Sequence, residues 1–155
     1  MYLLCTDGVA EFDLATQRFK TLLQGNVDAI YFNEKLYIGK REEVFVYNES
    51  TGNFDLFYHL AGKNITLSCL HLDKNKNLWM GTTSNGIYCL SEDKSLSRPV
   101  TKGNITSIYE DSSNELWIGS WEEGLYRVKT DGNIENLRHN PMNTNSLCSN
   151  FVRSC

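Results

Sequence analysis

The hydrophobic positions of this chain fall in short runs separated by polar turns. The run at 27–30 reads VDAI, the run at 67–70 reads LSCL and the run at 105–108 reads ITSI, so each begins and ends with an apolar residue and has small or polar residues between. Short runs of this kind, bounded by polar turns, favour strands, and no stretch of ten or more residues shows the 3.6-residue period of an amphipathic helix. We therefore expect an all-β protein.

One segment of the chain is repeated. The stretch NLWMGTTSNGIY at 77–88 returns as ELWIGSWEEGLY at 115–126, and a weaker copy, KLYIGKREEVFVY, lies at 35–47. The aromatic positions Tyr37, Trp79 and Trp117 are spaced 42 and then 38 residues apart (79 − 37 and 117 − 79). That spacing is typical of one propeller blade of four strands. The sequence predicts a β-propeller fragment of about four blades, each a four-stranded antiparallel sheet.

The repeat divides residues 1–155 into segments. We expect blade strands at 1–23, blades at 26–60, 64–100 and 104–138, a linker at 139–149 and the first strand of a next blade at 150–155. The first and last of these blades are incomplete, so they would leave unpaired strand edges. From this we expect self-association through the incomplete blades, with one copy completing a blade of another.

Two columns of small residues follow the repeat. One lies in the first strand of each blade, at Ala29, Cys69 and Ser107, where blades converge on a propeller axis and leave room only for short side chains. The other consists of glycines, at Gly39, Gly81 and Gly119. Glycine weakens a strand interior, so its repetition indicates that the next blade or an aromatic ring approaches the backbone closely.

Composition excludes several classes of function. The net charge is −4 and no basic stripe is present, which argues against nucleic acid as a partner. No run of 18 apolar residues occurs, so we expect no membrane contact from this segment. The five cysteines have no C-x-x-C spacing, which argues against a metal site. No histidine stands in a catalytic spacing and no glycine-rich phosphate loop opens a helix, so we expect neither a cofactor nor an enzyme.

Candidate ligand-binding residues come from one set of loops. In a propeller the loops joining second to third strands share a face with the loops joining one blade to the next, and ligands often bind there. The candidates are Arg41, Glu42, Asn85, Trp121, Glu122 and Glu123. An indole stacks well on a sugar face, with carboxylates accepting hydroxyl hydrogen bonds. Alternatively, Trp121 covers the neighbouring blade and the glutamates are solvated surface charge.

Two stretches, Ile108 to Tyr126 and Leu70 to Tyr88, resemble the pattern I-x-x-D-x-x-G-x-L-W-I-G-T-x-x-x-G-L-Y of two-component regulator propeller repeats. The closing NPMNTNSLCSNFVRSC at 140–155 is similar to that family's linker into a next blade. The resemblance implies a periplasmic, ligand-sensing propeller of the kind that polysaccharide-degrading gut bacteria use to detect glycan fragments. It also implies a histidine kinase further along the same polypeptide.

Two functional hypotheses follow. The first is a sensor module of a hybrid two-component signalling receptor, binding an oligosaccharide or another small ligand. The second is a non-sensing propeller scaffold for protein contacts, derived from a truncated gene. Because the 155 residues show no signal peptide and leave no room for a kinase, we expect a fragment or a truncated gene product.

Overall fold

The computed structural model describes residues 1–61, 65–97 and 101–155. The bounds 64 and 100 predicted for one blade therefore lie outside the described residues. The chain divides into two compact units, Met1–Leu67 and Ser68–Cys155.

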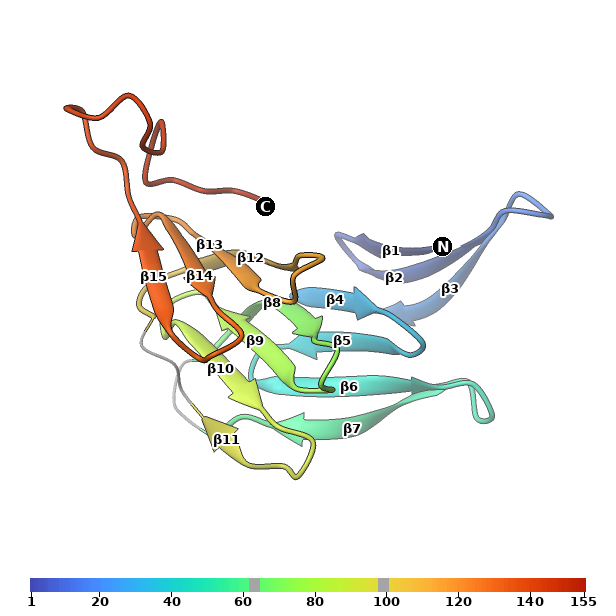
Figure 1. The fold of residues 1–155 in the computed structure, drawn as a ribbon. Helices are drawn as coiled ribbons and strands as arrows, with labels where there is room; N and C mark the ends of the chain where they lie inside the picture. The colour runs from blue at the N-terminus through green and yellow to red at the C-terminus, as the bar shows by residue number, and fades with distance from the viewer. Residues whose placement is uncertain (62–64, 98–100) are drawn as a thin grey trace. The chain divides into compact units, whose positions relative to one another are not determined.

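The first unit contains two antiparallel sheets in which the strands follow chain order. A three-stranded sheet is formed by β1 (Tyr2–Cys5), β2 (Gly8–Asp13) and β3 (Arg18–Gln24). A four-stranded sheet is formed by β4 (Ala29–Phe32), β5 (Leu36–Lys40), β6 (Glu43–Asn48) and β7 (Asn53–His59) (Figure 1). The core of the first unit is built from both sheets, around Val9 of β2 and Leu36 and Ile38 of β5.

The second unit contains two four-stranded antiparallel sheets. The first consists of β8 (Leu67–Leu72), whose first residue closes the preceding unit, β9 (Leu78–Thr82), β10 (Ile87–Leu90) and β11 (Leu96–Ser97). The second consists of β12 (Ile105–Glu110), β13 (Leu116–Ser120), β14 (Leu125–Val128) and β15 (Ile134–Leu137). No helix occurs among the described residues. The predicted all-β fold of about four blades is confirmed, with three strands in the first sheet.

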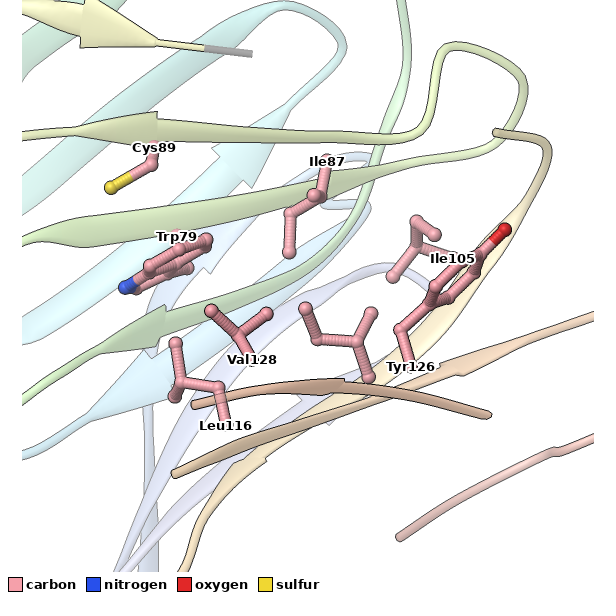
Figure 2. Packing of buried hydrophobic residues seen from close by; sticks show 8 residues of the cluster. Trp79, Ile87, Cys89, Ile105, Leu116, Tyr126 and Val128 are labelled. Atoms are coloured by element: carbon pink, nitrogen blue, oxygen red, sulfur yellow. The ribbon is translucent and has the colours of Figure 1, made fainter. Parts of the chain in front are cut away.

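The two sheets of the second unit pack face to face. Figure 2 shows Trp79, Ile87 and Cys89 of the β8–β11 sheet turned toward side chains of the β12–β15 sheet. The facing residues are Ile105, Leu116, Ile118, Tyr126 and Val128, and all are buried. Burial of this apolar surface is the main stabilising contribution in the unit.

The glycine column is explained by close approach of the next first strand. An ideal Cβ on Gly81 would lie 2.5 Å from the Cys69 sulfur and 2.8 Å from Cγ2 of Ile105. On Gly39 it would lie 3.0 Å from Cδ1 of Leu67 and 3.1 Å from Cβ of Ala29. The small column and the glycine column therefore face each other within a blade. The expected close approach of the next blade is confirmed at Gly39 and Gly81, whereas the later segment that approaches Gly119, with Val152 Cγ1 at 3.0 Å, forms no strand.

The repeated aromatic residue is held by a hydrogen bond to an aspartate six residues earlier. Trp79 Nε1 donates to Asp73 Oδ2 at 2.9 Å, and Trp117 Nε1 donates to Asp111 Oδ2 at 2.8 Å. The hydrogen bond from Trp117 lowers the pKa of the Asp111 carboxyl below its usual value. Trp79 is buried, whereas Trp117 is only half-buried, with the guanidinium of Arg127 lying 5.2 Å from its ring centroid.

Residues 150–155 form no strand, in contrast to the prediction. The segment is tied to the β12–β15 sheet by Val152, whose N–H donates to Ser120 O at 2.9 Å and whose carbonyl accepts from Thr106 Oγ1 at 2.6 Å. Gly124 N also donates to Asn150 O at 3.0 Å. A strand requires a continuous ladder with a neighbouring strand, and these few hydrogen bonds, one of them from a side chain, do not make one. The self-association expected from incomplete blades stays a prediction.

Candidate functional site

One end of the second unit gathers the turns that the sequence singled out. Gly86, in the β9–β10 turn, donates its N–H to Gly103 O at 3.0 Å. Trp121, in the β13–β14 turn, donates its N–H to Asn104 O at 2.9 Å. Residues 101–104 form the connection between the two sheets, so turns and connection lie side by side at this end. The loops of this unit therefore share one face, as expected. We call this end of the unit, formed by residues 83–86, 101–104 and 121–124, the Trp121 face.

A buried hydroxyl shapes each of these turns. Ser120 Oγ donates to Gly124 O at 2.8 Å and accepts from Glu123 N at 2.9 Å. Thr82 makes the equivalent bonds in the other turn, at 2.7 Å and 2.9 Å. Gly124 has a φ of +83°, and a Cβ there would lie 2.3 Å from Leu137 O. Only glycine fits that position without strain. In both turns a Ser or Thr stands four residues before a glycine, a feature that the sequence analysis did not use.

The indole of Trp121 is 41% exposed, although part of it is covered by the segment that follows. The Phe151 ring meets it edge-on, with centroids 5.7 Å apart, and the Arg153 guanidinium lies 5.9 Å from its centroid. These contacts hold the indole in one orientation while leaving much of its surface open to solvent. The sequence had not pointed to Phe151 or Arg153.

The two glutamates of the same turn differ in their surroundings. The Glu123 carboxylate forms an ion pair with the Arg138 guanidinium, so each of these two charges neutralises the other. Glu122 is exposed, and its main-chain carbonyl accepts a hydrogen bond from Arg138 Nη2 at 3.4 Å. Arg138 therefore fixes the turn that carries Trp121. It was also missed from the sequence, because no spacing rule links residue 138 to residue 123.

Asn85 lies at the same end of the unit as Trp121. Its main chain pairs with Gly103, and its Oδ1 accepts from Ser84 Oγ at 2.7 Å. The structure therefore places Asn85, Trp121, Glu122 and Glu123 at one end of the second unit.

Arg41 and Glu42 belong to the first unit. The Arg41 N–H donates to Asp28 Oδ2 at 2.5 Å, and the residue has a φ of +53°. Glu42 O accepts from Leu60 N at 2.8 Å, so this turn also lies beside the connection to the next blade. Whether these two residues share a site with Trp121 stays a prediction.

In the described part of the chain, no group of three or more His, Cys, Asp or Glu residues could hold a metal ion. His59 lies 3.5 Å from Glu43, and His139 Nδ1 lies 2.6 Å from a main-chain carbonyl, that of Leu147. No helix in the same residues has the length and hydropathy needed to cross a membrane.

His71 is the histidine with the most enclosed side chain, and it links the two sheets of the second unit. Its Nε2 lies 3.5 Å from Glu110 Oε2. Burial lowers the pKa of the imidazole below 6.5, and the carboxylates of Glu110 and Asp73 offset this only in part. The unfolded chain binds this proton near pH 6.5, and the folded chain binds it only at lower pH. The neutral, enclosed His71 therefore contributes its full stability above about pH 6.5. This contribution is lost as the pH falls from about 6.5 through the lower pKa of the folded chain.

We therefore expect the free energy of unfolding to decline less between about pH 7 and pH 5 in His71→Gln than in the unaltered chain. Urea unfolding followed by circular dichroism at several pH values measures this difference. His59→Gln, which removes a half-exposed histidine, is the control for losing a titratable ring. If the free energy of unfolding of His71→Gln depends on pH in the same way as that of the unaltered chain, the lowered pKa assigned to His71 is wrong.

The successive antiparallel sheets, repeated at blade length, identify the chain as a segment of an all-β propeller. The family model described as two component regulator propeller matches residues 59–84 and 99–122. These two segments are two-component regulator propeller repeats, and the resemblance drawn from the sequence is confirmed for them. Comparison with curated proteins gave no match.

Solved structures share this fold. The extracellular domain of a putative one component system from B. thetaiotaomicron has a TM-score of 0.80 at 18% identity, over 99% of this chain and 23% of that one. The extracellular domain of a putative hybrid two component system from the same organism has a TM-score of 0.77 at 23% identity, over 98% and 22%. The chain thus spans less than a quarter of these two domains.

A virginiamycin B lyase from Staphylococcus aureus also shares the fold. Its catalytically inactive form has a TM-score of 0.69 at 14% identity, over 86% of this chain and 49% of that one. At identities this low the likeness shows the fold alone. Because sensor domains and a lyase share it, the fold does not decide the function.

Proposed function

We propose that this chain is part of the extracytoplasmic sensor propeller of a two-component signalling receptor. The repeat match over residues 59–84 and 99–122 supports this, as does the likeness to extracellular domains of one- and two-component systems. In this role the chain binds a ligand and transmits its presence to a kinase elsewhere in the receptor, and it carries out no catalysis itself. Its location is then periplasmic.

We further propose that the ligand is a glycan fragment bound at the Trp121 face. The observation that carries this is the partly exposed indole, which contacts Phe151 and Arg153 and is followed in the same turn by the exposed Glu122. An oriented aromatic ring offers an apolar surface to the C–H face of a sugar, and carboxylates accept hydrogen bonds from its hydroxyls. Asn85 adds an amide at the same end of the unit.

We expect Trp121→Ala to weaken binding of such a glycan by about tenfold or more, since a lost stacking contact of about 1.4 kcal/mol changes the affinity tenfold. A glycan array, followed by calorimetry on each hit, measures this with the 155-residue chain and with the complete extracytoplasmic domain of the receptor. Tyr109→Ala is the control, because Tyr109 is an exposed aromatic of β12 outside the Trp121 face.

Two outcomes count against the proposal. Equal binding by Trp121→Ala and Tyr109→Ala would show that the indole only covers the adjacent segment. Absence of any glycan hit with both the chain and the complete extracytoplasmic domain would favour the alternative role, a scaffold for protein contacts.

A further inference from the structure

A groove of about 580 Å³ lies between the two sheets of the second unit, at the strand ends opposite the Trp121 face. Residues of the β8–β9, β12–β13 and β14–β15 turns line it. Strand β13 separates the two ends, with Leu116 at the groove and Ser120 at the Trp121 face. The volume falls in the range of about 300–1,000 Å³ that is usual for small-molecule sites. None of the residues discussed above as ligand candidates contributes to it.

Apolar side chains form the floor of the groove. They are Trp79, Leu116, Val128 and Ile134. The first three are buried members of the core and reach the groove with only a small part of their surface, whereas Ile134, at the start of β15, is 36% exposed. The indole N–H of Trp79 is already donated to Asp73, so it is not a free donor at the groove. The apolar part of the lining, mainly Ile134, therefore suits an apolar surface such as the C–H face of a small molecule.

Polar side chains line the rim, and the charges among them are balanced. The charged lining residues are two carboxylates, Asp73 and Glu110, and two lysines, Lys74 and Lys129. Lys129 forms an ion pair with Glu135, and the Glu110 carboxylate accepts a hydrogen bond from the main-chain N–H of Lys74 at 3.2 Å. No hydrogen bond within the described residues engages the side chains of three further lining residues, Asn75, Asn114 and Thr130. Uncharged amides and a hydroxyl thus remain to meet a ligand. Because neither sign of charge dominates, the rim suits a neutral ligand with several hydroxyl groups.

The turns that carry these groups are tightly held. Asp73 accepts from Asn77 N at 2.9 Å and Asp111 accepts from Glu115 N at 3.0 Å, which closes the first two turns. The third is closed by Gly132 N, which donates to Lys129 O at 2.9 Å. A groove bordered by such turns needs little ordering when a ligand binds, and this favours affinity.

We propose that this groove is a second binding site, which takes a neutral saccharide of two or three units. One apolar face of the sugar rests on Ile134, next to the small part of Trp79 that reaches the groove, and its hydroxyls meet Asn75, Asn114 and Thr130. The site is independent of the Trp121 face, because the two lie at opposite ends of the strands.

Fluorine NMR of the chain labelled with 5-fluorotryptophan tests this inference. Three tryptophans give three resonances, which single Trp→Phe variants assign. The labelled chain is titrated with maltotriose, cellotriose, xylotriose, mannotriose and chitotriose. We expect at least one of them to shift the Trp79 resonance, and to do so also in a Trp121→Phe background.

Two matched variants decide the location of the site. Ile134→Arg fills the groove and should abolish the shift of the Trp79 resonance. Leu137→Arg, on the same strand and 40% exposed but outside the groove, should leave it intact. The inference is overturned if no trisaccharide of the panel moves the Trp79 resonance, or if Ile134→Arg leaves the shift unchanged. A response of the Trp121 resonance alone would support the first site and overturn the second.

Discussion

Trp79→Ala is expected to lower the free energy of unfolding by about 3–5 kcal/mol, the range for removing a buried tryptophan from a core. Trp79 is 9% exposed and packs with Leu116 and Val128 of the adjacent sheet. The substitution leaves a cavity between two sheets that are joined mainly by this contact layer. It also removes a hydrogen-bond donor from Asp73, a carboxylate that is itself buried. Urea unfolding followed by far-ultraviolet circular dichroism measures the loss.

The other two tryptophans provide graded controls for this prediction. Trp117→Ala should cost less than Trp79→Ala, because Trp117 is half-buried and partly covered by Arg127. Trp121→Ala should cost the least, since its ring is the most exposed of the three. If Trp117→Ala melts no earlier than Trp121→Ala, the repeat alignment that pairs Trp117 with Trp79 is wrong.

Gly81→Ala is expected to destabilise the second unit by about 1–3 kcal/mol, which is typical of overpacking a tight core. The added methyl group would lie 2.5 Å from the Cys69 sulfur and 2.8 Å from Ile105 Cγ2, so the sheets must separate to admit it. Gly39→Ala is the matched control in the first unit. There the nearest atom, Cδ1 of Leu67, lies at 3.0 Å, and the expected loss is smaller.

A double-mutant cycle sharpens the test of Gly81. Cys69→Ala places alanine where the equivalent position of the first unit already has Ala29. In this background Gly81→Ala should cost less than in the unaltered chain, because the clash with sulfur is relieved while that with Ile105 remains. Additive losses in thermal melts would show that Cys69 does not limit the space at Gly81.

Much of the fold follows from local patterns that the sequence displays openly. Short apolar runs between polar turns predicted the strands, and the spacing of Tyr37, Trp79 and Trp117 predicted sheets of four strands at blade length. The facing of Gly81 and Cys69 was also foreseeable, because both belong to columns that recur with the repeat. These features could be predicted since each depends on residues close together in sequence, where period and register leave few alternatives.

The candidate site was predicted less completely. Repeat geometry placed Trp121 and Asn85 on loops at one end of the sheets, and that placement holds. Phe151, Arg153 and Arg138, which contact the indole or its turn, come from residues 15 to 32 positions further along, and no local rule connects them. The absence of a strand at 150–155 also escaped the pattern, because a strand depends on its neighbour as well as on its own sequence.

By itself, therefore, the sequence determined the all-β class, the blade repeat and the residues that would line each tight contact, because these follow from periodicity and side-chain size. Only the tertiary structure decided how far each tryptophan is exposed and which cations neutralise the turn glutamates. It alone showed the groove above Trp79. The physical reason is that exposure, ion pairing and cavities are properties of surfaces brought together from distant segments, and their fit depends on packing that no repeat encodes.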